Sequence, residues 1–393
     1  MKYIRNIAQV VITLGCATAL VAPALAAPAI NLTAADLSSG GPAAILAKLG
    51  ELKAVAASGK GKIAVLLPDT QSSDRWANVD APGFQAAFQA MGLTPDQYII
   101  ENAQGNPATQ QTQAEQAITQ GASVLVITNL DSGSAAAIEA NAKSQGVITI
   151  DYDRLTLNGS AAYYVSFDNE QVGKLQGEGL MQCNSDWKVA KPNIFELGGS
   201  PTDNNATLFE NGYDSILKPA YAAKTAVLAG TVRVPNWDNQ VGQTMFEQAY
   251  QAHPGINSVL AANDGLAQSV IAVLKNNKIP PNTVPVTGQD ATLQGAQNIL
   301  AGYQCMTVYK PIYEEVAAAA ALAVIARAGK TAGPAMLNGQ TNATSHQVPS
   351  ILLVPQSVTK ANMQATVIAD KFLDPSKVCA GTFATACTAA GVK

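Results

Sequence analysis

The chain has 393 residues, of which 13% are charged, and its formal net charge is −4. This length is enough for two domains with ordinary cores. The acidic balance and the lack of lysine and arginine clusters argue against nucleic acids and anionic membrane surfaces as partners. The two histidines are isolated and no Cys-x-x-Cys spacing occurs, so we expect no metal site and no cofactor.

The first 26 residues have the pattern of an export signal. Lys2 and Arg5 precede an apolar stretch, and Ala24 to Ala26 matches a small-residue cleavage site. We therefore expect a cleaved signal peptide over residues 1–26 and a mature chain in the periplasm or on the extracellular face. Cys16 leaves a lipid anchor open as the alternative.

Residues 27–60 are rich in Ala, Gly and Ser, with one helical patch from Ala43 to Ala56. We interpret them as an N-terminal extension or linker. From Lys62 onward, short apolar runs typical of strands alternate with longer amphipathic segments typical of helices. Glycine ends several of these segments, as at Gly92 and Gly121.

The repeated strand-helix-strand order predicts an α/β fold of parallel sheets wrapped by helices. The runs are more numerous than one sheet usually holds, so we expect two doubly wound lobes with a cleft between their carboxyl edges. The predicted strands are Ile63–Leu67, Tyr98–Ile100, Val124–Ile127, Val147–Ile150, Tyr163–Ser166, Asn193–Phe195, Val227–Val234, Val259–Ala261, Val284–Val286, Met306–Val308 and Ile351–Val354.

Four cysteines follow Cys16, and an even count in an exported chain suggests two disulfides. Cys379 and Cys387 are close enough to form a local pair, which leaves Cys183 for Cys305. Sequence alone leaves the other two pairings open.

Polar motifs follow two of the predicted strands. GGSPTDNNA (Gly198–Ala206) follows the run that begins at Asn193, and GQDA (Gly288–Ala291) follows Val284–Val286. The carboxyl ends of parallel strands are where open α/β sheets bind ligands. Asn and Asp side chains there offer paired donors and acceptors that suit the vicinal hydroxyls of a sugar. Phosphate would instead need cations and bare backbone amides.

These motifs occur in one order with Arg75-Trp76, Tyr152-Asp153-Arg154, Phe167–Glu170, Asn263-Asp264 and Thr307–Pro311. In that order they resemble the periplasmic sugar-binding proteins of ABC importers, of the xylose-binding and multiple-monosaccharide-binding type, over about residues 62–370. The resemblance implies the type I fold, in which two lobes joined by a three-crossing hinge close on a monosaccharide. It implies crossings near residues 165–168, 288–308 and 349–355. The lobes would then be formed by residues 61–165 plus 309–348 and by residues 166–308 plus 349–393.

The resemblance also implies which side chains bind the sugar, and it implies no catalytic residue. Arginines and carboxylates make paired hydrogen bonds around the edge of a sugar ring, and a tryptophan covers its apolar face. The implied substrate-binding residues are Arg75, Trp76, Asp153, Arg154, Asn205, Trp237, Asn263, Asp290 and Lys310.

Most of these residues also have a simpler interpretation. Arg154 beside Asp153 is also explained by a hinge ion pair, and Trp237 by a place in the core. Asn205 and Asp290 precede predicted helices and are candidate N-caps, a role that for Asn205 we expect in addition to ligand contact. Asp264 is expected to cap the following helix, which leaves the ligand contact to Asn263.

The function implied by the resemblance is a receptor that delivers a monosaccharide to the permease of an ABC importer, acting as a monomer. A sugar sensor for a chemoreceptor or sensor kinase would use the same cleft and stays open. A glycoside-acting enzyme is the weaker alternative, because cationic neighbours would hold Asp153 and Asp290 ionised and leave no proton donor. A transcription regulator would need a helix-turn-helix where the export signal stands.

Overall fold

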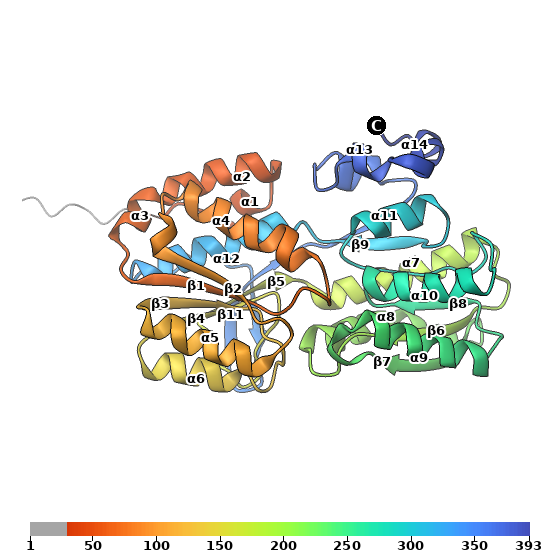
Figure 1. The fold of residues 1–393 in the computed structure, drawn as a ribbon, viewed down its shortest axis with the longest axis horizontal. Coiled ribbons are helices and arrows are strands. Elements are labelled where there is room, and N and C mark those ends of the chain that lie inside the picture. The colour runs from red at the N-terminus through yellow and green to blue at the C-terminus, as the bar shows by residue number, and fades with distance from the viewer. Residues whose placement is uncertain (1–29) are drawn as a thin grey trace, which may run out of the picture.

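The structure is a computed structural model that describes residues 30–393. The predicted signal peptide and Cys16 therefore lie outside the described residues. Two α/β lobes lie side by side, each with a parallel sheet between helices (Figure 1). This arrangement confirms the predicted fold class.

The first lobe is built on a seven-stranded sheet of order β10-β11-β5-β4-β3-β1-β2. All neighbouring strands are parallel except β10 and β11. The central strands are continuous apolar runs because helices cover both faces of the sheet. The strands are β1 (Lys62–Leu67), β2 (Tyr98–Asn102), β3 (Ala122–Ile127), β4 (Ile148–Tyr152), β5 (Tyr163–Phe167), β10 (Gly339–Asn342) and β11 (Gln347–Leu353).

Helix α12 (Ile312–Arg327) is the buried helix of this lobe, and Tyr313 is its one residue that is not buried. A helix that is apolar on all sides has to be covered on all sides. Strands β3, β4 and β5 cover one side, and α4 (Ala81–Ala90) covers another. Helices α5 (Pro107–Thr119) and α6 (Ala136–Ser144) pack on the strands β1, β3 and β4.

The N-terminal extension is folded and is not a linker, and its helices include the helical patch that we expected from Ala43 to Ala56. It forms α1 (Ala34–Leu37), α2 (Gly41–Leu49), η1 (Gly50–Leu52) and α3 (Lys53–Ser58). Ile45, Leu49 and Leu52 recur at helical spacing and are buried. Because α1, α2 and α3 all pack on α12, the extension supplies the cover that this apolar helix needs.

The second lobe contains a three-stranded parallel sheet of order β7-β6-β8 and an antiparallel pair, β9 and β12. The predicted strand Val284–Val286 is only a single bridge between Val259 and Val286, because Pro285 has no N–H to donate to a neighbouring strand. The strands are β6 (Asn193–Gly198), β7 (Val227–Arg233), β8 (Ser258–Ala261), β9 (Met306–Tyr309) and β12 (Gln356–Thr359). The helices are α7 (Asn169–Asp186), α8 (Asn204–Ala222), α9 (Asn239–Ala252), α10 (Asp264–Asn276) and α11 (Leu293–Leu300).

The chain crosses between the lobes three times. It passes from β5 to α7 at Asp168, from β9 to α12 at Lys310-Pro311, and from β11 to β12 at Val354-Pro355. The second crossing lies just past the expected range of 288–308. The boundary predicted between residues 348 and 349 falls inside β11, which pairs with β5 in the first lobe up to Leu353. The boundary therefore belongs between residues 354 and 355.

The last 30 or so residues form a helical tail on the second lobe, which comprises η5 (Gln364–Ile368), α13 (Pro375–Val378), η6 (Gly381–Phe383) and α14 (Ala384–Ala390). Figure 1 shows this tail over α11 and β9. Its apolar side chains, among them Leu373, Val378 and Val392, form a separate core with Ile299 and Leu300 of α11.

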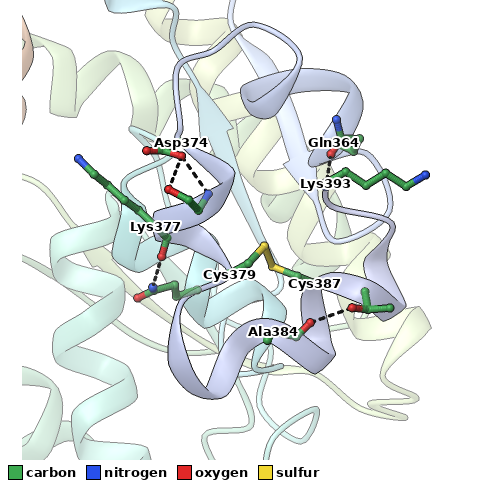
Figure 2. Close-up of a disulfide and its surroundings, with 10 residues drawn as sticks. Gln364, Asp374, Lys377, Cys379, Ala384, Cys387 and Lys393 are labelled. Carbon is green, nitrogen blue, oxygen red and sulfur yellow. Dashed lines mark hydrogen bonds between the residues drawn. A yellow bond between two sulfur atoms is a disulfide. The ribbon is translucent and has the colours of Figure 1, made fainter.

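Both disulfides follow the predicted pairing. Cys183 of α7 is bonded to Cys305, which precedes β9, and Cys379 is bonded to Cys387 within the tail. Figure 2 shows the second disulfide closing the tail on itself, with the backbone of Lys393 donating to Gln364. The tail is thus tied to itself by a covalent bond and to the lobe by its apolar core.

Candidate functional site

All nine residues that the resemblance implies line one cavity between the two lobes. Arg75 and Trp76 lie at the start of η2 (Trp76–Asp80), and Asp153 and Arg154 directly follow β4 of the first lobe. The others come from the second lobe and the hinge. The structure therefore brings together residues that are more than 200 positions apart in the sequence, because the carboxyl edges of the two sheets face each other.

Arg75 is the centre of a buried ionic cluster. Its Nε and Nη2 donate to the two oxygens of Asp80 at 3.0 and 2.7 Å, and Nη2 also donates to Glu315 at 2.7 Å. Its Nη1 donates to Asp153 at 2.8 Å. Within residues 30–393 only one N–H of Nη1 is left without a partner. Arg75 therefore has little capacity to form the two parallel bonds to a sugar that its sequence position suggests.

The carboxyl groups of the cluster differ in the direction in which their pKa values are shifted. Burial raises the pKa of Glu315 well above its ordinary value and also raises the pKa of Asp80, although Arg75 opposes both shifts. Burial acts in the same direction on Asp153, but the positive charges of Arg75, Lys310 and Arg154 lower its pKa overall. Asp153 is thus held as a carboxylate at the cavity wall.

Asp153 has a left-handed backbone with φ of 61°, which Asp tolerates better than most residues. This conformation follows directly after β4, at the end of the strand. Asn205 of α8 donates to the backbone and side-chain oxygens of Asp153, at 3.0 and 3.2 Å. A residue of each lobe is therefore bonded to the other at the floor of the cavity.

Arg154 and Trp237 meet at Asp203. The carboxylate of Asp203 accepts from the Trp237 indole at 2.9 Å, and Arg154 Nε lies 3.0 Å from the same oxygen. Arg154 Nη1 donates to Asn129 O at 3.1 Å, and Nη2 has no partner in the described part of the chain. Arg154 is therefore the arginine that keeps donors for a ligand.

Trp237 presents a flat apolar wall. It is 5% exposed, and Phe209 meets it edge-on with ring centroids 6.3 Å apart. A Cβ on Gly199 would lie 2.0 Å from the Trp237 ring, so the second glycine of GGSPTDNNA is what lets the indole lie against the chain. Trp76 forms another wall and lies under Arg75, whose Cζ is 4.2 Å from the ring centroid.

Lys310 and Asp290 form the hinge side of the cavity. Lys310 Nζ lies 3.2 Å from Asp290 and 3.9 Å from Asp153. Asp290 also accepts from Ser73 Oγ across the cleft at 3.3 Å. Asn263 Nδ2 makes a second such bond, to Ser72 O at 3.3 Å. These bonds hold the described conformation closed.

Three cap assignments made from the sequence were wrong. Asp203, not Asn205, is the N-cap of α8, which frees the Asn205 amide for Asp153. Asn263 caps α10 by accepting from Leu266 N, and Asp264 is instead buried among Gln304, Thr292 and Thr307.

Thr292 is the N-cap of α11. Asp290 lies two residues earlier and points to Lys310.

The sequence argument missed five further residues that line the cavity: Ser72, Ser73, Asp203, Phe209 and Gln289. Asp203 and Gln289 stand inside the two motifs, next to the residues chosen. Phe209 lies one helical turn after Asn205, a spacing that puts both on one face of α8. Gln289 Oε1 is buried and has no hydrogen-bond partner within residues 30–393. It is therefore a hydrogen-bond acceptor at the cavity with no donor from the described part of the protein.

The cavity balances its charges and is nearly filled. Three cations, Arg75, Arg154 and Lys310, line it with three carboxylates, Asp153, Asp203 and Asp290. The space between these side chains is about 30 Å³, which is room for one or two waters. A larger ligand would enter only if the lobes separated or the side chains moved, and would then replace the interlobe bonds.

A family model described as periplasmic binding protein domain matches residues 63–331. The D-xylose-binding periplasmic protein of Escherichia coli is 35% identical over 320 residues, covering 81% of this chain and 92% of that protein. The multiple sugar-binding periplasmic receptor ChvE of Rhizobium radiobacter is 31% identical, covering 79% of this chain and 90% of that protein.

Solved structures of solute binding proteins are also similar to this chain. The carbohydrate transporter solute binding protein of Chloroflexus aurantiacus, in complex with D-glucose, has a TM-score of 0.72 at 27% identity. The match covers 80% of this chain and 97% of that one. An ABC transporter solute binding protein of Clostridium phytofermentans with bound β-D-glucose has a TM-score of 0.71 at 25% identity and covers 80% and 99% of the two chains. Among residues 30–393, no helix is both long and apolar enough to span a membrane.

Proposed function

Because the chain belongs to the periplasmic binding protein family and has its type I fold, we propose that it captures a monosaccharide and delivers it to an ABC sugar importer. The relatives named above bind D-xylose and other sugars, and two of the similar structures hold D-glucose. D-Xylose or a related pentose or hexose is therefore the ligand we propose for this chain.

The observation that carries this proposal is the cavity itself. Side chains from both lobes converge on it, and its three cations are matched by three carboxylates. A ligand with a full charge would disturb this balance in a buried site, at a large energetic cost. A neutral ligand with many hydroxyls would instead find forked donors and acceptors on every side.

We assign the roles from the hydrogen bonds that each side chain has left. Arg154 Nη2 and the remaining Arg75 N–H donate to sugar oxygens. Asp290 and Asp153 accept from hydroxyls. The amides of Asn205 and Asn263 exchange their interlobe bonds for bonds to the sugar, with Lys310 as a further donor. Trp237 and Trp76 cover the faces of the ring, where the C–H groups lie.

The mechanism that follows is hinge closure. The sugar bridges the lobes, and the three crossings at residues 168, 310–311 and 354–355 bend. Closure is favoured when the ligand binds the closed form more tightly than the open one. The permease would then recognise the closed pair of lobes, with the receptor acting as a monomer.

We propose further that the cleft is not catalytic. Glycoside hydrolysis needs one carboxyl group that holds a proton and one that does not. Neighbouring cations lower the pKa of Asp153, and Lys310 is paired with Asp290. Asp153 is therefore held without the proton that the acid must supply, and we expect 4-nitrophenyl glycosides incubated with the protein to release no nitrophenol.

For location, we propose that residues 1–26 direct export and that the mature chain works in the periplasm. The alternative is a lipid anchor at Cys16. Mass spectrometry of the mature protein distinguishes the two, since cleavage after Ala26 removes Cys16 and anchoring retains it with added lipid.

Binding itself is tested with a panel of pentoses and hexoses in thermal unfolding and calorimetry. A ligand at 100 times its Kd should stabilise the fold by about 2.7 kcal/mol. We expect at least one aldose to give saturable heat and a matching increase in Tm. If no common pentose or hexose gives either signal, the proposed function is wrong.

A further inference from the structure

A second space adjoins the cavity, on the side where the tail lies. It is a groove of about 900 Å³ between the lobes, and Arg75 and Asp290 line both it and the cavity. Asp74 lines the groove and its neighbour Ser73 lines the cavity. The two spaces are therefore adjacent, and the side chains of Arg75 and Asp290 form the wall that they share.

The tail supplies one wall of this groove. Eight residues of the tail between Gln364 and Lys377, together with Lys393, line the groove with Asn78 and Val79 of the first lobe and Leu293 of α11. The tail is anchored by its own apolar core, by its disulfide (Figure 2) and by the bond from Gln297 to Lys377 O. Such a wall is preorganised, because little of its conformational freedom is left to lose when a ligand binds.

The groove has a mixed surface chemistry. Val79, Leu293, Phe372 and Leu373 offer apolar contact, and Lys371 and Lys377 stand at its exposed rim. Leu293 is one of the few large apolar side chains in the described chain that is exposed, at 38%. A surface of this kind fits a ring with apolar faces and a polar edge. Trp237 and its polar neighbours give the cavity the same combination of apolar and polar contacts.

We propose that the groove is a second binding compartment that holds a ring attached to the bound sugar, so that the protein accepts glycosides as well as free monosaccharides. The attached ring is a second sugar or an aromatic aglycone, both of which have apolar faces and polar edges. The glycosidic oxygen would point past Arg75 and Asp290. This inference rests on the proposed function, since the first ring occupies the cavity.

Calorimetry on the full mature protein tests it with D-xylose, methyl and 4-nitrophenyl xylosides in both anomers, and xylobiose, and with the corresponding D-glucose series. We expect at least one ring-bearing glycoside to bind at least as tightly as its parent sugar. Binding of the 4-nitrophenyl compound alone would identify an aryl compartment, and binding of the disaccharide alone a saccharide compartment.

Two matched variants locate the compartment. Leu293→Asp changes a 38% exposed residue in the first turn of α11, and Val241→Asp changes a 39% exposed residue in the first turn of α9, which lines neither space. Acidic residues are tolerated in a first helical turn. Leu293→Asp should weaken the glycoside about tenfold and leave the parent sugar within about twofold, and Val241→Asp should change neither.

Three results would overturn the inference. If a monosaccharide binds and every ring-bearing glycoside is excluded, the groove is no ligand compartment and the receptor function stands. If Leu293→Asp weakens parent sugar and glycoside alike, or weakens neither, the second ring lies elsewhere. If no sugar of either series binds, the proposed function fails, and this inference fails with it.

Discussion

Arg154 of the first lobe and Asp203 of the second form a buried ion pair, with Arg154 Nε 3.0 Å from Asp203 Oδ2. The same oxygen of Asp203 accepts from Trp237. One carboxylate therefore fixes both the arginine that keeps free donors and the tryptophan that forms the apolar wall. Since it joins the lobes at the ligand site, the pair links sugar recognition to closure.

Arg154→Ala should weaken ligand binding without unfolding the protein. Hydrogen bonds to charged groups contribute about 1.5–3 kcal/mol, so we expect an affinity loss of about 10- to 100-fold and a smaller ligand-dependent increase in Tm than in wild type. Arg154→Lys keeps the charge beside Asp203 but not the fork, and should fall between wild type and alanine. A normal ligand response in Arg154→Ala would contradict the site assignment.

Arg75→Met should lower the free energy of unfolding strongly. Its effect on ligand affinity should be smaller, because most donors of Arg75 are already bonded within the protein. The change leaves Asp80, Asp153 and Glu315 without their shared cation, and breaking a buried pair on one side costs about 3–5 kcal/mol. Arg233→Met is the matched control, because its pair with Glu210 is about one-third exposed and should cost under about 1 kcal/mol. Equal losses in the free energy of unfolding would refute the central role of Arg75.

Glu315→Gln should be much milder than Arg75→Met. Burial raises the pKa of Glu315 well above its ordinary value, so replacing this carboxyl with a neutral amide should cost less stability than removing the cation of the cluster. We expect the Tm of this variant at pH 7 to lie within a few degrees of wild type. A decrease as large as that of Arg75→Met would mean that Glu315 acts as a carboxylate in the cluster.

The fold should lose stability between pH 4.5 and 8. Burial and the neighbouring Asp370 raise the pKa of Glu314 from its ordinary 4.5 to about 8, against the effect of its bond with Tyr313. In that window the folded state keeps a proton on Glu314 that the unfolded state has lost, so the contribution of this group to stability falls as pH rises and is lost by about pH 8. Burial likewise raises the pKa of Asp264 to about 7, from an ordinary 3.8.

Glu314→Gln should reduce this loss of stability. Thermal unfolding at pH 5, 6.5 and 8 would show a smaller decrease in Tm for the variant than for wild type. Glu115→Gln, a change at an exposed position on α5, is the control and should follow the wild-type curve. If Glu314→Gln follows it too, Glu314 is not the titrating group.

The two disulfides should differ in what their removal costs. Cys183 and Cys305 are 122 residues apart, and Cys379 and Cys387 are 8 apart. In the loop-entropy description the first contributes about 5 kcal/mol and the second about 2–3 kcal/mol. Replacing the first pair with serine should lower the global Tm, whereas replacing the second should mainly expose the tail to proteases. A large global effect from the second pair would show that the tail folds as part of the lobe core.

The sequence by itself determined the architecture and nine of the residues that line the cavity. Apolar runs separated by helical segments are enough to predict parallel sheets, since the period of hydrophobic residues reflects which faces are covered. The family resemblance of the polar motifs, several of which follow strands, implied residues such as Asp153 and Asp290 without coordinates. The extension was interpreted as an extension or linker because nothing in its own sequence shows what its apolar residues pack against. In the structure they pack on the apolar surface of α12, which would otherwise be exposed to solvent.

Only the tertiary structure decided what each polar side chain is free to do. Arg75 and Arg154 both follow strands, but Asp80, Asp153 and Glu315 occupy most of the donors of Arg75. Nη2 of Arg154 has no partner in the described chain. The tail wall and its groove arise in the same way, from segments that meet across the lobes. Hydrogen-bond capacity depends on three-dimensional neighbours, which local sequence patterns do not encode.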